Sequence, residues 1–205
     1  MAIAKKIEDF IEKSSWIRKM FEEGARLKAI HGAENVFDFS LGNPDLEPPN
    51  GFKQHLREII ENESPGLHAY MPNAGYAHTR KAVADYLSHE QGSDISENEV
   101  IMTCGAAGGL NIIFKAILDP EDEVITPAPY FVEYGFYADN HGGRLVPVPT
   151  RPDFTIDVKA IDAAISEKTK AVLINSPNNP TGQVYSEQNL AQLSQCLTDH
   201  CRRMG

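Results

Sequence analysis

Residues 176–182 have the sequence Ser-Pro-Asn-Asn-Pro-Thr-Gly, and they directly follow the run Lys-Ala-Val-Leu-Ile-Asn at residues 170–175. The apolar run predicts a buried strand, and the amides, prolines and glycine predict a loop at its carboxyl end. In open α/β sheets ligands bind at that edge. Because each proline fixes φ and removes a backbone donor, the two asparagines are expected in a stiff frame. The loop by itself is compatible with a ligand-binding element and with an ordinary tight turn.

The rest of the chain alternates between the two periodicities of regular structure. From residue 99 onward, strands and helices follow each other regularly, which predicts a largely parallel sheet with helices on both faces. Gly32 is expected to end the first helix, Ser186 to cap the last, and Gly205 to follow it as a C-cap glycine. The expected strands are 36–40, 100–103, 123–126, 144–148 and 171–174, and the expected helices are 7–30, 52–62, 79–89, 108–118, 131–140, 158–165 and 186–203.

Composition narrows the class of protein. The chain has 205 residues, 41% of them hydrophobic, which is enough to bury a core. The net charge of -10 is spread along the chain and argues against nucleic acid as a partner, since phosphate binding needs a basic face. No apolar stretch approaches membrane-spanning length and no signal-peptide core is present. We expect a cytoplasmic protein that binds neither nucleic acid nor membrane.

The cysteines and histidines offer little chemistry in the sequence. Three cysteines are an odd number without motif spacing, which fits a reducing cytoplasm better than a disulfide framework. Cys196, His200 and Cys201 lie close together on one expected helix, but their spacing matches no zinc pattern, so we predict no metal site. No set of residues stands out as a hydrolytic triad, and no carboxylate pair suggests glycoside hydrolysis.

Three other segments are candidates for ligand binding. Residues 103–110, Thr-Cys-Gly-Ala-Ala-Gly-Gly-Leu, join a strand to a helix, where small residues and the helix dipole suit an anion. Close helix–strand packing would also explain those small residues. Tyr130 and Phe131, next to two prolines, could stack on a planar ligand or belong to the core. Tyr70 could donate to a phosphate or be a buried structural tyrosine.

Taken in order, these segments resemble the fold-type I pyridoxal-phosphate (PLP) aminotransferases of class I/II, related to aspartate aminotransferase. The resemblance implies an α/β fold: a three-layer α/β/α large domain with a mainly parallel sheet, truncated here. It places an N-terminal helix and arm of the small domain at residues 1–48 and an incomplete PLP-binding large domain at 49–205. The segments are Ser40–Asp45, Tyr70–Gly75, Gly105–Leu110, Pro129–Phe131 and the Asn-Asn-Pro-Thr-Gly loop.

The resemblance also implies roles for the cofactor's phosphate. Ala106 and Ala107, next to Gly105, would donate backbone N–H groups to it. Relatives often have a hydroxyl or lysine side chain at these positions. In this chain, phosphate binding would therefore depend more on backbone donors. Tyr70 would reach the phosphate bound in the other subunit, which implies a homodimer.

Further implied roles concern the ring and the substrate. Phe131 would stack on the pyridine ring, and Asn179 would hydrogen-bond its phenolic oxygen, through a loop whose Asn179–Pro180 bond the family often keeps cis. Gly42 would offer its backbone to the substrate carboxylate, and Phe131 and Asn179 would also border the substrate. Many aspartate-specific members have Trp in place of Phe131, so the donor amino acid stays open.

The implied reaction is transamination between an amino acid and a 2-oxo acid by the full-length protein. The family's Schiff-base lysine, the Asp paired with the ring nitrogen and the substrate-clamping Arg lie beyond the last of these segments. We therefore assign no catalytic residue and expect a fragment that is inactive alone. The alternatives are a PLP-dependent lyase or decarboxylase of the same fold, or a non-catalytic binding module.

Overall fold

The computed structural model describes residues 3–39, 42, 46–62 and 65–204. Contacts between residues divide the chain into two compact units, Met1–Ala69 and Tyr70–Gly205, called here the N-terminal unit and the sheet unit. The boundary expected between residues 48 and 49 concerns the family's small and large domains and stays a prediction.

The N-terminal unit consists of helices and extended segments. Helix α1 (Lys5–His31) ends at Gly32, whose φ of 86° suits glycine and whose N–H donates to the Lys28 carbonyl, so the predicted helix and its end are confirmed. A short 3-10 helix (Ala33–Asn35) and helix α2 (Asn50–Glu61) follow. None of the side chains described in this unit is buried.

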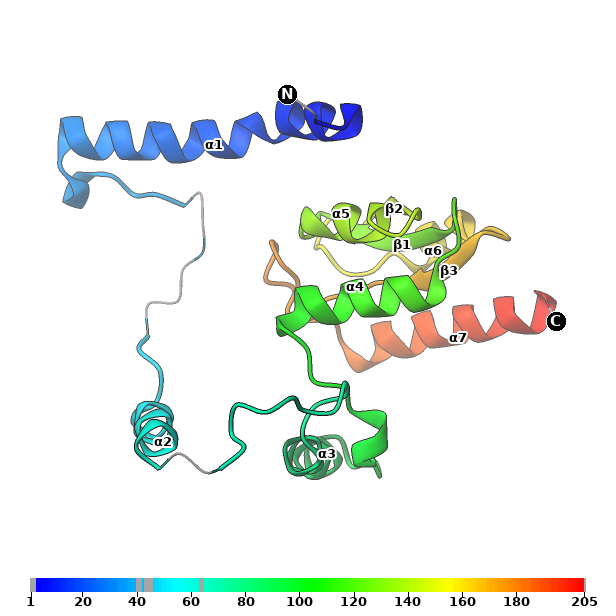
Figure 1. Cartoon of the computed structure of the whole chain (residues 1–205). Helices are drawn as coiled ribbons and strands as arrows, with labels where there is room; N and C mark the ends of the chain where they lie inside the picture. The colour runs from blue at the N-terminus through cyan, green and yellow to red at the C-terminus, as the bar shows by residue number, and fades with distance from the viewer. Residues whose placement is uncertain (1–2, 40–41, 43–45, 63–64, 205) are drawn as a thin grey trace. The chain divides into compact units, whose positions relative to one another are not determined.

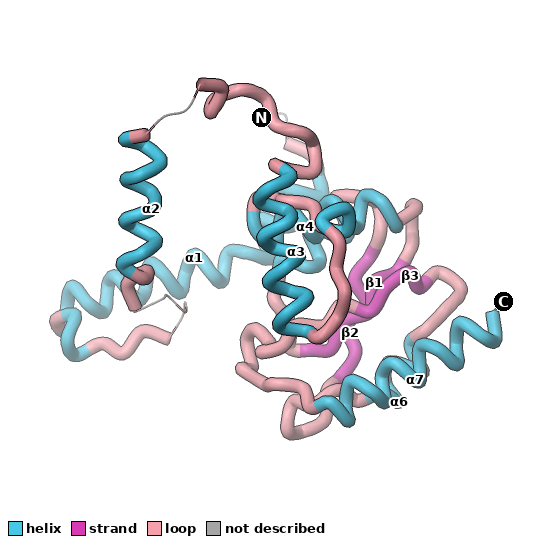
Figure 2. The backbone as a smooth tube through the Cα atoms, turned by 90° about the horizontal axis from the view of Figure 1, so that it is seen from below, coloured by secondary structure: helices cyan, strands magenta, loops and turns pink. Residues whose placement is uncertain are grey.

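The sheet unit contains three parallel strands in the order β2-β1-β3, which confirms the predicted parallel sheet. Its elements in chain order are α3 (Ala77–Gln91), a 3-10 helix (Glu97–Glu99), α4 (Gly105–Ile117), β1 (Glu123–Ala128), α5 (Glu133–Asp139), β2 (Arg144–Pro149), α6 (Val158–Ala164), β3 (Thr169–Val172) and α7 (Glu187–Met204). Figure 2 shows the strands between α4 on one side and the α6–α7 pair on the other, and Figure 1 labels the same elements in another view.

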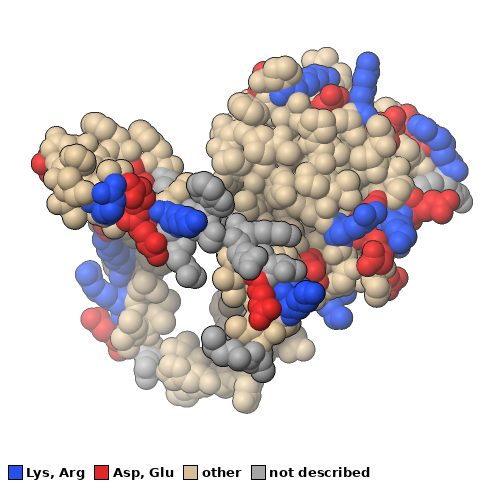
Figure 3. Space-filling view, turned by 90° about the horizontal axis from the view of Figure 1, so that it is seen from above, with Lys and Arg blue, Asp and Glu red and all other residues tan. Residues whose placement is uncertain are grey.

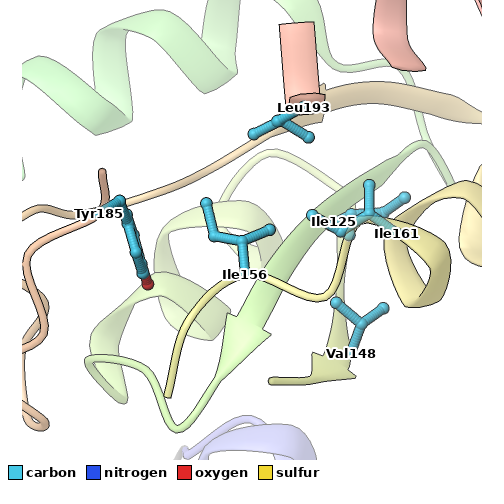
Figure 4. Packing of buried hydrophobic residues seen from close by; sticks show 6 residues of the cluster. All are labelled: Ile125, Val148, Ile156, Ile161, Tyr185 and Leu193. Atoms are coloured by element: carbon cyan, nitrogen blue, oxygen red, sulfur yellow. The ribbon is translucent and has the colours of Figure 1, made fainter. Parts of the chain in front are cut away.

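Two adjacent residues of β1 show how the sheet is covered. Side chains alternate between the faces of a strand, so Val124 and Ile125 point to opposite sides. Both are fully buried. Val124 packs with residues of α4 and α5, and Ile125 packs with residues of β2, α6 and α7. Figure 4 shows the second cluster, with Ile125, Val148, Ile156, Ile161, Tyr185 and Leu193. The predicted helices on both faces are confirmed.

Two predicted strands are wrong as regular structure. Residues 36–39 and 100–103 form no strand, and residue 40 lies outside the described part. Val36 and Val100 nevertheless have extended backbones, with φ/ψ of -120°/108° and -109°/128°. A strand needs a ladder of hydrogen bonds to a neighbour, and within the described residues these segments have no neighbouring strand. The extended conformation was predicted correctly and the pairing was not.

The cap of α7, the character of the helices and the surface charge bear on three further predictions. Ser186 caps α7 as predicted, because its Oγ accepts from the Asn189 backbone N–H at 3.2 Å, while Gly205 lies outside the described residues. Among the helices described, none combines the length and apolar character that crossing a membrane requires. On the face drawn in Figure 3, acidic and basic side chains lie next to one another at several places.

Candidate functional site

The Asn-Asn-Pro-Thr-Gly loop is held in place by the first of its two asparagines. Asn178 is buried, at 8% exposure, and its Nδ2 donates to the Pro129 carbonyl at 3.1 Å and to Thr181 Oγ1 at 2.9 Å. Its own backbone N–H donates to the Gln183 carbonyl. Asn178 therefore joins the loop after β3 to the loop after β1. Sequence analysis did not assign this role, for which the only signal was a second amide in the loop.

The second asparagine has a different environment. The Asn179 side chain is exposed, while its backbone N–H donates to Asn175 Oδ1 at 2.8 Å. The Asn179–Pro180 bond is cis, as the resemblance implied. The backbone of Asn179 is thus fixed, and its side-chain amide is accessible to a ligand at the carboxyl edge of the sheet.

The loop after β1 presents the two aromatic residues considered from the sequence. Tyr130 and Phe131 are both partly buried and pack against the cluster that contains Val124. The Phe131 ring meets the Tyr134 ring edge-on, with centroids 5.6 Å apart and planes at 80°. Burial raises the pKa of Tyr134, so its hydroxyl stays protonated at neutral pH. Phe131 is therefore supported by the core and keeps an exposed part at the sheet edge.

The start of α4 has the geometry of an anion site. Gly105 opens the helix with φ +68°, a conformation that favours glycine, and Thr103 Oγ1 donates to its carbonyl. Cys104, at the N-cap, makes no side-chain hydrogen bond to the helix. Ala106 and Ala107 are exposed in the first turn, where backbone N–H groups have no acceptor within the helix. These donors and the helix dipole fit a phosphate group.

Three of the predicted site segments therefore lie in one neighbourhood. The strands β1 and β3 are parallel neighbours, so their following loops share the carboxyl edge, and Asn178 links those loops directly. Leu110, one turn into α4, belongs to the same packed cluster as Phe131. The loops 103–109, 128–131 and 175–183 contain no charged residue. An anion here would be held by backbone donors and the helix dipole.

The other two predicted residues, Tyr70 and Gly42, belong to segments other than these three loops. Tyr70 is fully exposed at the start of the sheet unit, in a loop fixed where the Met102 N–H donates to the Ala74 carbonyl. Gly75 in that loop has φ +98°, and a Cβ there would lie 2.7 Å from Met102 Cγ, so glycine is required. Gly42 is exposed and belongs to the N-terminal unit. Its proposed contact with the substrate therefore stays a prediction.

The comparison with protein families agrees with this geometry. The model of the family "Aminotransferase class I and II" matches residues 34–204, which is most of the chain. The chain belongs to the class I and II aminotransferases. This is a PLP-dependent family, and the uncapped start of α4, the supported ring of Phe131 and the exposed Asn179 amide fit such a cofactor.

Similar proteins share about half of their length with this chain. A probable aspartate/prephenate aminotransferase of Thermus aquaticus is 40% identical over 78% of this chain and 42% of its own length. An aspartate aminotransferase of Bacillus subtilis is 34% identical over 86% of this chain and 45% of its own length. A solved aminotransferase of Eubacterium rectale has a TM-score of 0.94 at 38% identity, covering 100% of this chain and 52% of its own. The family's fold is therefore established for the part present here.

Proposed function

We propose that the full-length protein transfers an amino group between an amino acid and a 2-oxo acid with PLP as cofactor. The observation that supports this most directly is that three uncharged loops lie in one neighbourhood: two follow β1 and β3 at the carboxyl edge of the sheet, and the third opens α4 with free backbone donors. When bound, PLP supplies the electron sink that makes the amino acid's Cα–H bond breakable. The chain's own contribution is binding and orientation.

Each proposed contact has a residue with suitable chemistry. The N–H groups of Ala106 and Ala107 would hold the phosphate, which explains why side chains without donors suffice there. Phe131 would fix the plane of the ring, and the Asn179 amide would donate to the phenolic oxygen. Tyr70, fully exposed, would reach the phosphate of a second copy in a homodimer. Gly42 would offer its backbone to the substrate carboxylate.

The substrate and the location are further proposals. The similar proteins are named for aspartate, prephenate and aromatic amino acids, and one Thermus thermophilus aspartate aminotransferase was solved with maleate, a dicarboxylate. Phe131 has no N–H to offer a second carboxylate, so strict aspartate specificity is not proposed. A cytoplasmic location stays a prediction. A lyase or decarboxylase of the same fold is the alternative, and turnover of amino donors with 2-oxo acids separates the two reactions.

The 205-residue chain by itself is proposed to be inactive in amino transfer. None of the three loops contains a lysine. Lys170, five residues before the third loop, is the second residue of β3 and forms an ion pair with Asp122 at 3.7 Å. Borohydride reduction in the presence of PLP, followed by mass spectrometry, tests this. We expect no stoichiometric adduct on a single lysine, and finding one would contradict the proposal.

The cofactor contacts are tested on the full-length protein. We expect Asn179→Ala to weaken PLP binding at least tenfold, measured by titration of the cofactor's absorbance. The matched control is Asn98→Ala, an exposed asparagine within the 3-10 helix Glu97–Glu99, which should leave PLP binding unchanged. Equal affinity of Asn179→Ala and the unmodified protein would remove Asn179 from the site.

A further inference from the structure

A second group of ligand-type side chains lies away from the candidate cofactor site. Cys196 and His200 are four residues apart on α7, so they occupy the same face of that helix. Helix α6 packs against α7 and adds Asp162 to the pair. One ligand atom from each residue lies within 4.8 Å of the others. Three residues from two helices thus converge on one point.

This group lies at the opposite edge of the sheet from the cofactor loops. A cavity of about 220 Å³ beside it is lined by His200, Cys201 and residues 169–172 of β3. His200 also lines a second cavity with Ile165, Ser166 and Glu167, which lie just before Thr169, the first residue of β3, so the group lies at the amino end of the strand. The candidate cofactor loop begins at the other end of the same strand. The two sites therefore use different parts of the fold.

The two distances from Asp162 Oδ1 are close to those that one tetrahedral metal ion imposes, and the third pair of ligand atoms lies within 4.8 Å. Asp162 Oδ1 lies 2.7 Å from His200 Nε2 and 3.5 Å from Cys196 Sγ. Metal–ligand bonds of about 2.0–2.3 Å put tetrahedral ligand atoms about 3.3–3.7 Å apart. The shorter contact would have to open by roughly half an ångström, which the half-exposed side chain of Asp162 can accommodate.

We propose that Asp162, Cys196 and His200 form a binding site for a divalent zinc ion. A thiolate, an imidazole and a carboxylate are the three ligand types that zinc uses in proteins, and their mixed softness disfavours calcium and magnesium. His200 is 20% exposed and Asp162 50% exposed, so the site faces solvent on one side. Water would take the fourth position, as it does at zinc sites with three protein ligands.

Zinc binding would have to replace the hydrogen bonds that join the three side chains in the absence of metal. Cys196 Sγ donates to Asp162, and His200 pairs with the same oxygen. Burial raises the pKa of the Cys196 thiol, and the hydrogen bond to Asp162 raises it further. Zinc must therefore release the thiol proton on binding. Of the neighbouring charges, Asp199 favours a cation and Arg203 opposes it.

The test uses the 205-residue chain, freed of metal and titrated with zinc against a chromophoric chelator. We expect one zinc ion per chain, with an affinity that falls at least tenfold in each of Asp162→Asn, Cys196→Ser and His200→Gln. Cys201→Ser is the matched control, because Cys201 is exposed on the same helix and outside the group. That variant should bind zinc as the unmodified chain does.

Cobalt provides a measurement that does not depend on the stability of the variants. Cobalt bound at this site in the unmodified chain should show thiolate-to-metal charge-transfer absorption and the intense visible bands of a tetrahedral ion. X-ray absorption of the zinc form should show one sulfur ligand at about 2.3 Å with the rest nitrogen or oxygen. Absence of stoichiometric binding, a spectrum without a sulfur ligand, or an affinity unchanged by Cys196→Ser would each overturn the proposal and leave an ordinary hydrogen-bonded contact between helices.

Discussion

The N-terminal unit and the sheet unit both contain amphipathic helices, but among the side chains that the structure describes, only the sheet unit has buried ones. In the N-terminal unit, Ile30, Phe52 and Ile60 are between 55% and 72% exposed. In the sheet unit, Val124 and Ile125 are fully buried on opposite faces of one strand. Helix formation depends on local sequence, whereas burial needs a second layer. A substitution should therefore have very different effects in the two units, even where the residue types are alike.

The largest difference is expected between two large apolar residues. Ile125→Ala should lower the free energy of unfolding by about 2–5 kcal/mol, because it leaves a cavity in a packed cluster. Phe37→Ala in the N-terminal unit should change it by less than about 0.5 kcal/mol, since Phe37 is 82% exposed. Urea denaturation followed by circular dichroism measures both. A large loss for Phe37→Ala would show that the N-terminal unit has a core of its own.

A second contrast separates the two adjacent asparagines of the sheet unit. Asn178→Ala should cost about 1–3 kcal/mol, because it removes a buried amide that donates to the Pro129 carbonyl and to Thr181 Oγ1. Asn179→Ala removes an exposed amide and should stay within about 0.5 kcal/mol. The same denaturation experiment compares the two variants. Similar losses would mean that Asn179 is part of the frame and not available to a ligand.

A third contrast concerns two glutamates with ion-pair partners. Glu123 is buried, accepts from Ser166 Oγ and Thr169 Oγ1, and pairs with Arg144. Glu123→Gln should cost about 1–2 kcal/mol at pH 7. Glu47 in the N-terminal unit pairs with Lys53 with its own side chain 84% exposed, so Glu47→Gln should cost less than about 1 kcal/mol.

The pH dependence of unfolding distinguishes the role of the Glu123 charge. The hydrogen bond from Ser166, and next to it the pair with Arg144, lowers the pKa of Glu123 in the folded state. The ionised carboxylate contributes fully to the free energy of unfolding above the unfolded-state pKa of about 4.3. This contribution is lost as the pH falls through the lower pKa of the folded state. The difference in stability between the unmodified chain and Glu123→Gln should therefore shrink below about pH 4. A difference that stays constant there would contradict the role of the charge.

The contrast between the units also explains which parts of the fold follow from the sequence. From α4 onward, the strands and helices were predicted within a few residues, because periodicity, caps and glycines are local signals. The segments 36–39 and 100–103 were predicted as strands from the same local signals. They are extended but unpaired, because pairing depends on a neighbour that a local pattern does not specify.

The candidate site shows the same limit in its side chains. The three loops were predicted at one edge because parallel strands place their carboxyl ends together. The two asparagines are equivalent in the sequence, and the contact with the Pro129 carbonyl, 49 residues before Asn178, is what makes one of them link two loops. Asp162 is likewise 34 and 38 residues from Cys196 and His200. Contacts at that separation follow from how helices pack on the sheet and cannot be found from spacing.

The smallest expected effect tests whether the first turn of α2 in the N-terminal unit is free of packing contacts. Gly51 lies in the first turn of α2, and a Cβ at this position would meet no atom within 4 Å. Gly51→Ala should therefore stabilise α2 by about 0.4–1 kcal/mol, because alanine loses less backbone entropy on folding. Far-ultraviolet circular dichroism and amide hydrogen exchange in α2 measure the gain. The control is Gly66→Ala, which is also without neighbours but has φ +88°, so alanine there should destabilise the loop. If Gly51→Ala weakens α2 instead, its first turn is packed against something, and the N-terminal unit is more like the sheet unit than its exposed side chains indicate.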